Sequence, residues 1–317
     1  MPSASVVIAT WNRAALLDEC LRHLAQQPYG SGDEVLIVDN GSTDHTAAVV
    51  DQHACQFPVP LRRLYEPTPG KSHAIAAGLH AATGDLIVFT DDDVNVGDGW
   101  LLALTRAFLH PKVALAGGPV HPRWERRAPR WLALASHSRL GAPLGLLDYG
   151  TTPQRLGART LLGANMALRR SVLDDLGGYA PHLGKLRGTL LSGEDHELCE
   201  RVQGAGHEAW YQPDAIVSHW VPAERMRLGY FLRWFFWSGI TNATMDDDRR
   251  SQGGHLRPAY LLRQFSTGIA AACASAMRGR LPSAVDRALD SAFAAGYAAA
   301  RFGMVRTGTI SNPARHV

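Results

Sequence analysis

Polar side chains that suit phosphate or metal chemistry follow several short apolar runs in the first hundred residues. The triplet Asp91, Asp92 and Asp93 directly follows the apolar run DLIVFT. Ligands of open α/β sheets bind outside the carboxyl ends of strands. Carboxylates held there can share a hard cation such as Mg²⁺ or Mn²⁺, which in turn bridges phosphate oxygens. The alternative is a solvent-facing turn that caps the next helix.

A second acidic triplet serves as an internal control. Asp246, Asp247 and Asp248 follow a helical pattern and lead into Arg249 and Arg250. We interpret this triplet as a solvated helix end. Three adjacent aspartates therefore do not identify a metal site by themselves. The prediction of a site at Asp91–Asp93 depends on the strand that precedes it.

Other polar groups are expected at the same edge of the sheet. Thr10 and Arg13 lie at the end of the first strand, and Asp39 ends the second. A carboxylate at Asp39 can accept hydrogen bonds from a base N–H or a ribose hydroxyl, and the alternative is a structural Asx-turn. Lys71 opens a helix after Gly70, where it suits an anion. An exposed surface lysine is the alternative.

The second half of the chain offers a candidate base and a candidate ligand. Glu194 and Asp195 open a helix after Gly193. One of these carboxylates could accept the proton of an attacking hydroxyl, although acidic residues also favour the first turn of any helix. His219, in the strand-like segment IVSHW, is a candidate metal or phosphate ligand, or a structural histidine.

The elements that must position these residues alternate between strand and helix. Apolar, β-branched runs predict strands over 5–10, 34–39 and 85–90, with a weaker strand over 61–65, and helical patterns separate them. This rhythm predicts an α/β fold with a mostly parallel sheet flanked by helices. Further elements are expected beyond residue 112: a strand over 113–116, helices over 170–176 and 194–204, a strand pair near 208–220, and helices from 228 onward.

Bulk composition excludes several classes of protein. With 46% hydrophobic and 19% charged residues the chain is globular, and a net charge of +3 gives no field suited to nucleic acid. Four scattered cysteines indicate a reducing compartment. We read no signal peptide and no apolar run of about 18 residues, so a cytoplasmic location is expected.

In their order and spacing, six segments resemble the family 2 glycosyltransferases of GT-A fold, over about residues 4–225. They are VVIATWNR, VDNGSTD, GKSHAIAAGL, the aspartate triplet, GANMALRR and GED. The resemblance implies a Rossmann-like GT-A catalytic domain over 1–225. A nucleotide-sugar half over about 1–118 would precede an acceptor half over about 119–225. Residues 226–317 would form a C-terminal helical extension.

The resemblance also implies an inverting, metal-assisted mechanism. Mn²⁺ or Mg²⁺ would offset charge on the nucleoside diphosphate leaving group. Asp195 would be the catalytic base, and Glu194 beside it would steer the acceptor. The expected metal ligands are Asp91, Asp93 and His219, and the expected donor-binding residues are Thr10, Arg13, Asp39, Lys71, Asp91 and Asp92.

Two departures from the family pattern concern neighbouring positions. Many relatives carry Arg or Asn where this chain has Ile75 and Ala76, so donor contacts from that helix beyond Lys71 are in doubt. After Asp195, this chain has His196 and Glu197 where another acid often follows, which changes the charge near the base.

Acceptor recognition is expected in the loop over 121–160. The faces of Trp124 and Trp131 can stack on sugar rings, or can instead pack the loop onto the sheet. We also assign Asn165, in GANMALRR, to acceptor binding. The aromatic helix over 228–244 suits an anionic membrane surface and a lipid-linked acceptor, with packing on the rest of the protein as the alternative.

The predicted partners are therefore a nucleotide-sugar donor, with UDP favoured because the family often uses it, and a glycan or lipid-linked acceptor. Contact with the inner face of the membrane is an extension of this prediction. Two rival functions remain: a nucleotidyltransferase, which would normally carry a glycine-rich loop near its N-terminus, and a non-catalytic sugar-binding module.

Overall fold

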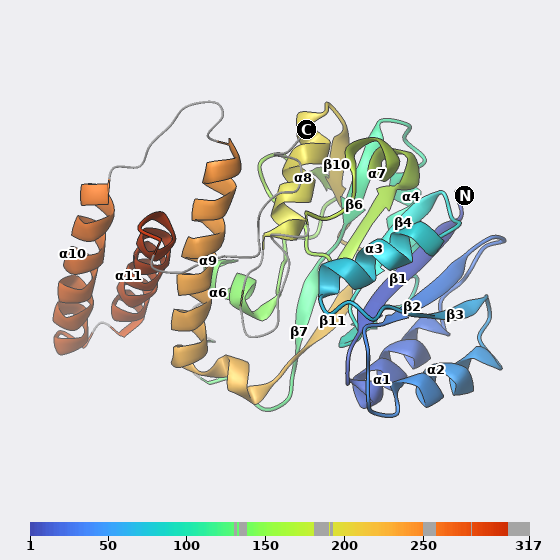
Figure 1. The fold of residues 1–317 in the computed structure, drawn as a ribbon, viewed down its shortest axis with the longest axis horizontal. Coiled ribbons are helices and arrows are strands. Elements are labelled where there is room, and N and C mark those ends of the chain that lie inside the picture. The colour runs from blue at the N-terminus through green and yellow to red at the C-terminus, as the bar shows by residue number, and fades with distance from the viewer. Residues whose placement is uncertain are drawn as a thin grey trace. The chain divides into compact units, whose positions relative to one another are not determined.

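The computed structural model describes residues 1–129, 132, 138–180, 190, 193–249, 258–279 and 281–303. The chain forms two compact units (Figure 1). The first comprises Met1–Arg123, Gly145–Ala180 and Glu194–Trp220. The second comprises the described parts of Trp124–Leu144, Pro181–Gly193 and Val221–Val317. The domain boundaries expected near residues 118 and 225 stay predictions.

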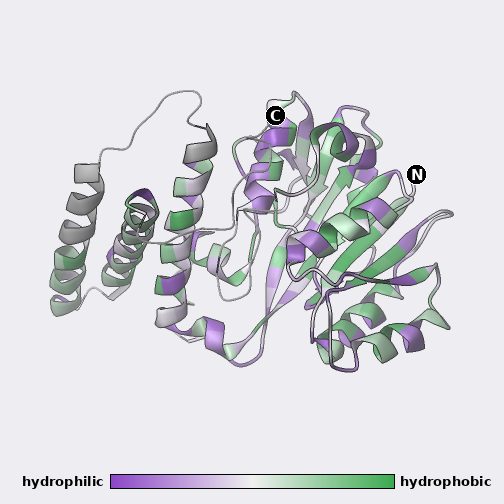
Figure 2. Cartoon of the chain, viewed as in Figure 1, coloured by the Kyte–Doolittle hydropathy of each residue, from purple (hydrophilic) through white to green (hydrophobic). Residues whose placement is uncertain are grey.

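An eight-stranded, mostly parallel sheet forms the centre of the first unit, as predicted. Its order is β3 (Leu61–Tyr65), β2 (Glu34–Asp39), β1 (Ala4–Thr10), β4 (Leu86–Thr90), β9 (Asn165–Arg169), β6 (Val113–Gly117), β10 (Glu208–Tyr211) and β8 (Gln154–Arg155). Strands β9 and β8 run antiparallel to their neighbours. Strands β1, β2, β4 and β6 are almost entirely buried, which explains their unbroken apolar sequences (Figure 2).

The strand order creates a switch point beside β1. Strand β2 lies on one side of β1 and β4 on the other, and both pair with it in parallel. Because such crossovers are right-handed, α1 (Ala14–Leu24) and α2 (Thr46–Ala54) cover one face, and α3 (Lys71–Ala81) covers the other (Figure 1). Ligands of such sheets bind where the strand order reverses. The carboxyl ends of β1 and β4 therefore mark the expected site.

Helix α3 approaches the sheet closely at Gly78. A methyl group at this position would lie 2.4 Å from Val7 Cγ1 and 3.1 Å from Val38 Cγ2. The glycine therefore sets the height of the helix above β1 and β2, and with it the position of Lys71 at the helix N-terminus. The remaining helices of this unit are α4 (Trp100–Ala107), α7 (Arg170–Leu176) and α8 (Glu194–Gly204).

A second sheet corrects one expectation. Strands β5 (Val94–Val96), β11 (Val217–Val221) and β7 (Val120–Trp124) form a separate three-stranded sheet. The two strands expected near 208–220 are present but do not pair with each other. The turn between them packs on the chain after β6: Asn165 Nδ2 donates to Ala215 O, and a methyl at Gly118 would lie 2.2 Å from that oxygen. This turn directs β11 toward β5, whereas β10 stays beside β6.

The C-terminal helices are α9 (Leu228–Arg249), α10 (Pro258–Met277) and α11 (Leu281–Arg301), and α11 packs against both others. Short elements in the same unit are α6 (Ser138–Gly141), η1 (Ala142–Leu144) and η3 (Ala223–Met226). The control triplet lies within α9, where Asp246 accepts a hydrogen bond of 2.7 Å from Tyr297 Oη. Asp246 is thus an interhelical contact rather than part of a solvated end. Among the described residues, no helix has the length and apolar content needed to span a bilayer.

Candidate active site

The turn between β1 and α1 directs Arg13 back over the end of the sheet. Asn12 has φ +52°, a left-handed conformation that asparagine tolerates better than most residues. The neighbouring β2–α2 loop holds this conformation: Asn12 N donates to Ser42 Oγ at 3.0 Å, and Thr43 N donates to Asn12 Oδ1 at 2.7 Å. Ala14 N also donates to Asp44. The first two loops therefore brace each other.

Arg13 and Thr10 hold two carboxylates of the aspartate triplet. Arg13 Nη1 donates to Asp92 Oδ1 at 2.9 Å and to Asp93 Oδ2 at 2.8 Å, and Thr10 Oγ1 donates to Asp92 Oδ2 at 2.8 Å. Both carboxylates are buried. Burial raises the pKa of Asp92 to about 6, although the Arg13 charge acts in the opposite direction. These contacts join β1 and β4 across the switch point.

Asp93 and His219 present the donor atoms that a divalent cation would take. Asp93 Oδ1 is buried and accepts no hydrogen bond from the described residues. His219 Nε2, from β11, lies 3.5 Å from it. Among the described residues, no three His, Cys, Asp or Glu side chains form a group that could hold a metal by themselves. Mg²⁺, however, usually takes one or two carboxylates together with substrate phosphates, so this partial ligand set fits a cation that arrives with the donor.

Lys71 links the triplet to helix α8. Its Nζ donates to Asp91 Oδ1 at 2.5 Å. Burial lowers the pKa of Lys71, but the charges of Asp91 and then Asp195 outweigh it, and the net pKa is raised. Asn40 positions this lysine by bridging two loops: its Nδ2 donates to Glu66 O and Thr68 O, and its Oδ1 accepts from Gly70 N.

Asp195 is fixed at the N-terminus of α8. Its Oδ2 accepts a hydrogen bond of 2.8 Å from Gly163 N, and Tyr179 donates a second bond to the carboxylate. Burial raises the pKa of Asp195, against the effects of Lys71 and of these two donors. Glu194 precedes it, and both residues are partly exposed. The carboxylate is thus held by two donors, in a residue that is only partly buried.

Asp39 lies at the neighbouring strand end, paired in register with Thr10. Its Oδ1 accepts from Ser42 N at 2.8 Å, as an Asx-turn requires, and Arg63 Nη1 lies 3.5 Å from Oδ2. The Asx-turn, which was the structural alternative for Asp39, is therefore present. The proposed contact between Asp39 and a nucleoside base stays a prediction. Among the described residues, Oδ2 has the 3.5 Å ion pair with Arg63, so this oxygen can still accept from a base.

The two residues assigned to the acceptor are placed very differently. Trp124, the last residue of β7, is half-buried. Asn165 is fully buried, and its amide bonds to Trp100 Nε1, Pro119 O and Ala215 O. Because Asn165 holds neighbouring segments together through these contacts, we no longer assign it to the acceptor site. Trp131 lies outside the described residues.

The structure also shows positioning residues that sequence reasoning did not find. Asn12 and Asn40 were visible as turn formers, but their partners lie in other loops and have no local signature. Gly163 and Tyr179 contact Asp195 from segments that are 32 and 16 positions away in the sequence. Local patterns carry no information on such contacts.

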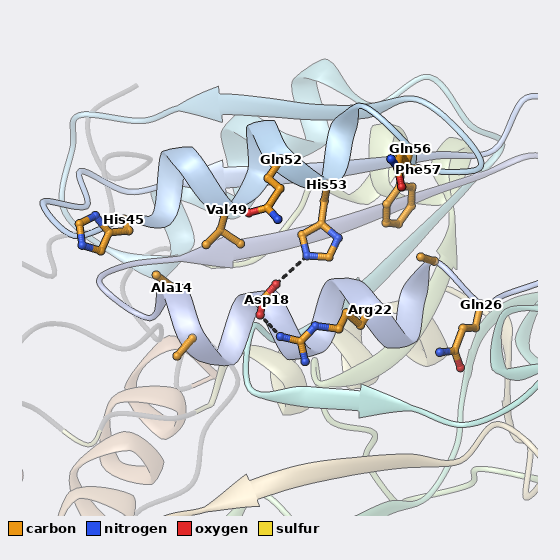
Figure 3. Close-up of a pocket in the computed structure, with 12 residues that line it drawn as sticks. Ala14, Asp18, Arg22, Gln26, His45, Val49, Gln52, His53, Gln56 and Phe57 are labelled. Atoms are coloured by element: carbon orange, nitrogen blue, oxygen red, sulfur yellow. Dashed lines mark hydrogen bonds and ion pairs between the residues drawn. The ribbon is translucent and has the colours of Figure 1, made fainter.

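A cavity of about 850 Å³ lies away from this cluster, between α1 and α2 (Figure 3). It contains none of the predicted site residues. An ion chain crosses it: Asp18 pairs with His53 Nε2 at 2.8 Å and with Arg22. The carboxyl edge of the sheet, not this cavity, gathers the candidate residues.

Comparison with known proteins agrees with this geometry. A family model described as glycosyltransferase-like family 2 matches residues 2–233. The chain is 24% identical to a glucosyl-dolichyl phosphate glucuronosyltransferase of Haloferax volcanii over 246 residues, which are 76% of this chain and 77% of that protein. It is 32% identical to a pre-mycofactocin glycosyltransferase of Mycobacterium tuberculosis over 218 residues, 68% of this chain and 42% of the relative.

Among solved structures, a mannosyltransferase of Pyrobaculum calidifontis, in complex with GDP-Man and Mn²⁺, has a similar fold. The TM-score is 0.60 at 21% identity, and the match covers 96% of this chain and 88% of the other. The family match spans the acidic strand end, Lys71 and the start of α8. The chain therefore belongs to the glycosyltransferase-like family 2 and is a glycosyltransferase with a GT-A fold.

Proposed function

We propose that this enzyme transfers a sugar from a nucleotide-sugar to a hydroxyl group of a glycan or lipid-linked acceptor, with inversion at the anomeric carbon. Asp195 is the general base. The observation that carries the proposal is the position of Lys71, which donates a hydrogen bond to Asp91 and whose charge also acts on the partly exposed residue Asp195.

The donor side of the site is the end of β1, β2 and β4. Thr10, Arg13 and Asp39 lie at the first two strand ends, where the nucleoside would bind. Lys71 lies at the N-terminus of α3, and both its charge and the helix dipole favour a diphosphate. Asp91 and Asp92 complete the donor-binding set.

The residues that would hold a divalent cation are Asp93 and His219, with Asp91 beside them. When bound with the donor, Mn²⁺ or Mg²⁺ supplies positive charge that offsets the charge developing on the nucleoside diphosphate. The complexes of the Pyrobaculum mannosyltransferase with GDP-Man and Mn²⁺, and of GalNAc-T7 with UDP, GalNAc and Mn²⁺, support a metal.

The acceptor side begins at α8. Asp195 accepts the proton of the acceptor hydroxyl while that oxygen attacks the anomeric carbon. The new glycosidic C–O bond forms as the bond to the diphosphate oxygen breaks, and the leaving group keeps the electron pair. One carboxylate on the face opposite the leaving group suffices, and Glu194 beside it steers the acceptor.

The acceptor class rests on two observations. The Haloferax relative acts on a glucosyl-dolichyl phosphate, and a further relative is the succinoglycan biosynthesis protein ExoM of Rhizobium meliloti, 28% identical over 243 residues. We therefore favour a lipid-linked or polysaccharide acceptor, with Trp124 at its site. The cytoplasmic location and the UDP base stay predictions.

A panel of UDP-, GDP- and TDP-sugars, assayed for transfer and hydrolysis with Mn²⁺, tests the proposal. We expect turnover with one base, loss of activity on chelation, and a fall in kcat of about 10²- to 10⁴-fold in Asp195→Asn, the range typical of a general base. Asp214→Asn, which changes an exposed aspartate of the same unit, is the matched control. Full activity in Asp195→Asn would rule out the base assignment.

The rival functions lose support. A nucleotidyltransferase and a non-catalytic sugar-binding module were both compatible with isolated strand-end acids. Membership of a glycosyltransferase family, together with a reachable Asp195 near that cluster, favours catalysis of glycosyl transfer over either one.

A further inference from the structure

We propose that Tyr179 and the backbone N–H of Gly163 form a fixed seat for the carboxylate of Asp195, and that Tyr179 is a positioning residue of the transfer reaction. This inference rests on the proposed role of Asp195 as the base. It assigns a role to Gly163, the first residue of GANMALRR, and to Tyr179, which lies in none of the six segments.

Two donors and one close approach define the seat. Gly163 N donates to Asp195 Oδ2 at 2.8 Å. The Tyr179 hydroxyl donates to the same carboxylate. A methyl group built on Gly163 would lie 2.7 Å from both Asp195 Oδ1 and Tyr179 Oη, so the two oxygens flank one spot above this glycine. Gly163 is therefore required for space.

Tyr179 is itself held by the core of the first unit. Its ring packs on Phe89 of β4, with 5.3 Å between centroids. The preceding residue, Gly178, lies so near α3 that a methyl there would be 2.9 Å from Leu79 Cδ1. Burial, together with the charge of Asp195, raises the pKa of Tyr179, so its hydroxyl keeps its proton and acts as a donor. The seat is thus anchored to the strand that carries the aspartate triplet.

The seat also decides which lone pairs of Asp195 remain available. A carboxylate has about four lone-pair directions. Two donors take one direction each, and Lys71 adds positive charge from the side of α3. In this proposal the remaining directions are left for an acceptor hydroxyl, and Asp195 is partly exposed. A general base must lie within hydrogen-bond reach of the proton that it accepts. If the Asp195 carboxylate could rotate, kcat would therefore fall, whereas the affinity for the donor would not change.

Tyr179→Phe tests the proposal, because it removes the hydroxyl and keeps the ring on Phe89. We expect kcat to fall about 10- to 100-fold, the equivalent of one hydrogen bond to a charged group, with little change in the KM of the donor. Tyr211→Phe is the matched control. This tyrosine is fully buried, and its hydroxyl donates to Asp148 at 3.1 Å, so the variant should keep wild-type kcat.

Gly163→Ala is an independent probe of the same seat. Its methyl group would displace both Asp195 and Tyr179, so we expect a loss of kcat at least as large as in Tyr179→Phe. Gly204→Ala on α8 is the control, because a methyl there meets no atom within 4 Å. Donor-induced thermal stabilisation of each variant shows that it folds and binds nucleotide.

A double variant separates positioning from a merely structural role. In the Asp195→Asn background, Tyr179→Phe should cause no further loss of kcat, because both changes act through one carboxylate. In the wild type, the hydrogen bond from Tyr179 lowers the pKa of Asp195. Tyr179→Phe removes this bond, so the pKa of Asp195 should rise and the acidic limb of the kcat–pH profile should move to higher pH. Lys71, Asp91, Glu194 and Cys199 also face this pair and remain unchanged.

The outcomes distinguish the two proposals. If Asp195→Asn is inactive while Tyr179→Phe and Gly163→Ala keep wild-type kcat, the seat is refuted and the base stands. Additive losses in the double variant would also refute the seat. If Asp195→Asn is fully active, the proposed function itself fails.

Discussion

At the scale of single residues, three adjacent aspartates have three different environments. Asp91 pairs with Lys71 and faces α8, whereas Asp92 turns to Thr10 and Arg13. Asp93 shares Arg13 but keeps one buried oxygen beside His219. Proximity in sequence therefore does not give these carboxylates one role. Lys71 matters most here, because it bonds to Asp91 of the triplet and its charge acts on the base.

Substituting Lys71 should affect donor binding and the base together. In Lys71→Gln, we expect donor affinity to fall about 10- to 100-fold, as for the loss of a charged hydrogen bond. The Lys71 charge lowers the pKa of Asp195, so its removal should raise that pKa and move the acidic limb of kcat/KM to higher pH. Steady-state kinetics between pH 5 and 9 measures both effects.

Two comparisons complete this test. Lys71→Arg should recover part of the donor affinity, because it keeps the charge but changes the geometry. Lys112→Gln removes an exposed charge of the same unit and should behave as wild type. An unchanged donor KM in Lys71→Gln would argue against diphosphate binding by this residue.

At the scale of elements, buried polar contacts set how strands and loops meet. Glu34, at the start of β2, is buried and accepts hydrogen bonds from Ser5 of β1, Thr83 before β4 and Arg62 of β3. One carboxylate thus ties four segments together at the edge opposite the site. Burial tends to raise the pKa of Glu34, but its donors outweigh that effect, and the pKa is lowered.

The Glu34 contacts should make stability depend on pH in a defined direction. A carboxyl with a lowered folded-state pKa contributes stability that is present above its unfolded pKa and is lost as pH falls through the folded value. We expect Glu34→Gln to cost about 1.5–3 kcal/mol at pH 7. The difference from wild type should shrink below about pH 4, as the wild-type carboxyl protonates. Urea unfolding at pH 7 and pH 3.5 measures it, and a constant difference would contradict the assignment.

Two glycines set the contact between α9 and α11. A methyl at Gly296 would lie 1.8 Å from Phe236 O, and one at Gly239 would lie 2.1 Å from Phe293 O. Each glycine therefore admits the backbone of the partner helix, and no larger residue fits without separating the helices.

Gly296→Ala should accordingly destabilise the helical unit, by about 1–3 kcal/mol, as other overpacked sites do. Gly229 lies on α9, the partner helix, and a methyl group there meets no atom within 4 Å. Gly229→Ala should therefore be neutral or stabilising by up to about 1 kcal/mol, because alanine favours a helix. Differential scanning calorimetry of the two variants gives the comparison. Equal transition temperatures would show that the helices do not meet at these glycines.

At the scale of the whole molecule, both units expose some large apolar side chains, such as Tyr65 and Leu109 of the first. The first unit buries its apolar strands and gathers charged groups at one sheet edge. The second carries exposed apolar side chains at Leu228, Ile269, Met277 and Phe302. A large exposed apolar side chain is unremarkable when isolated, but a group of them on helices suits an interfacial contact. Contact of this unit with a membrane surface stays a prediction, for which the exposed Ile269 and Met277 of α10 are the candidates.

Binding to vesicles tests that contact. We expect the enzyme to sediment with vesicles that contain anionic lipid, and the bound fraction to fall several-fold in the double variant Ile269→Glu, Met277→Glu. The double variant Leu109→Glu, Tyr65→Glu changes two exposed apolar residues of the first unit and should bind as wild type does. Equal binding of both double variants would place the contact elsewhere or exclude it.

The amino-acid sequence by itself determined the local elements and the class of chemistry. Buried parallel strands need continuous apolar runs, so β2 has the bounds that its sequence predicted. The partly exposed strand β3 and the helices α7 and α8 also have the predicted bounds. The six ordered segments led to the family, because each marks the end or start of such an element. These features depend on a few neighbouring residues.

Only the tertiary structure decided which side chains meet. The separation of β10 from β11, the burial of Asn165 and the interhelical bond of Asp246 all depend on residues far apart in sequence. The seat of Asp195 is the clearest case, because Gly163 and Tyr179 reach it only when β4, α3 and α8 are packed. Local propensity fixes where a strand ends, whereas packing fixes what the residues at that end contact.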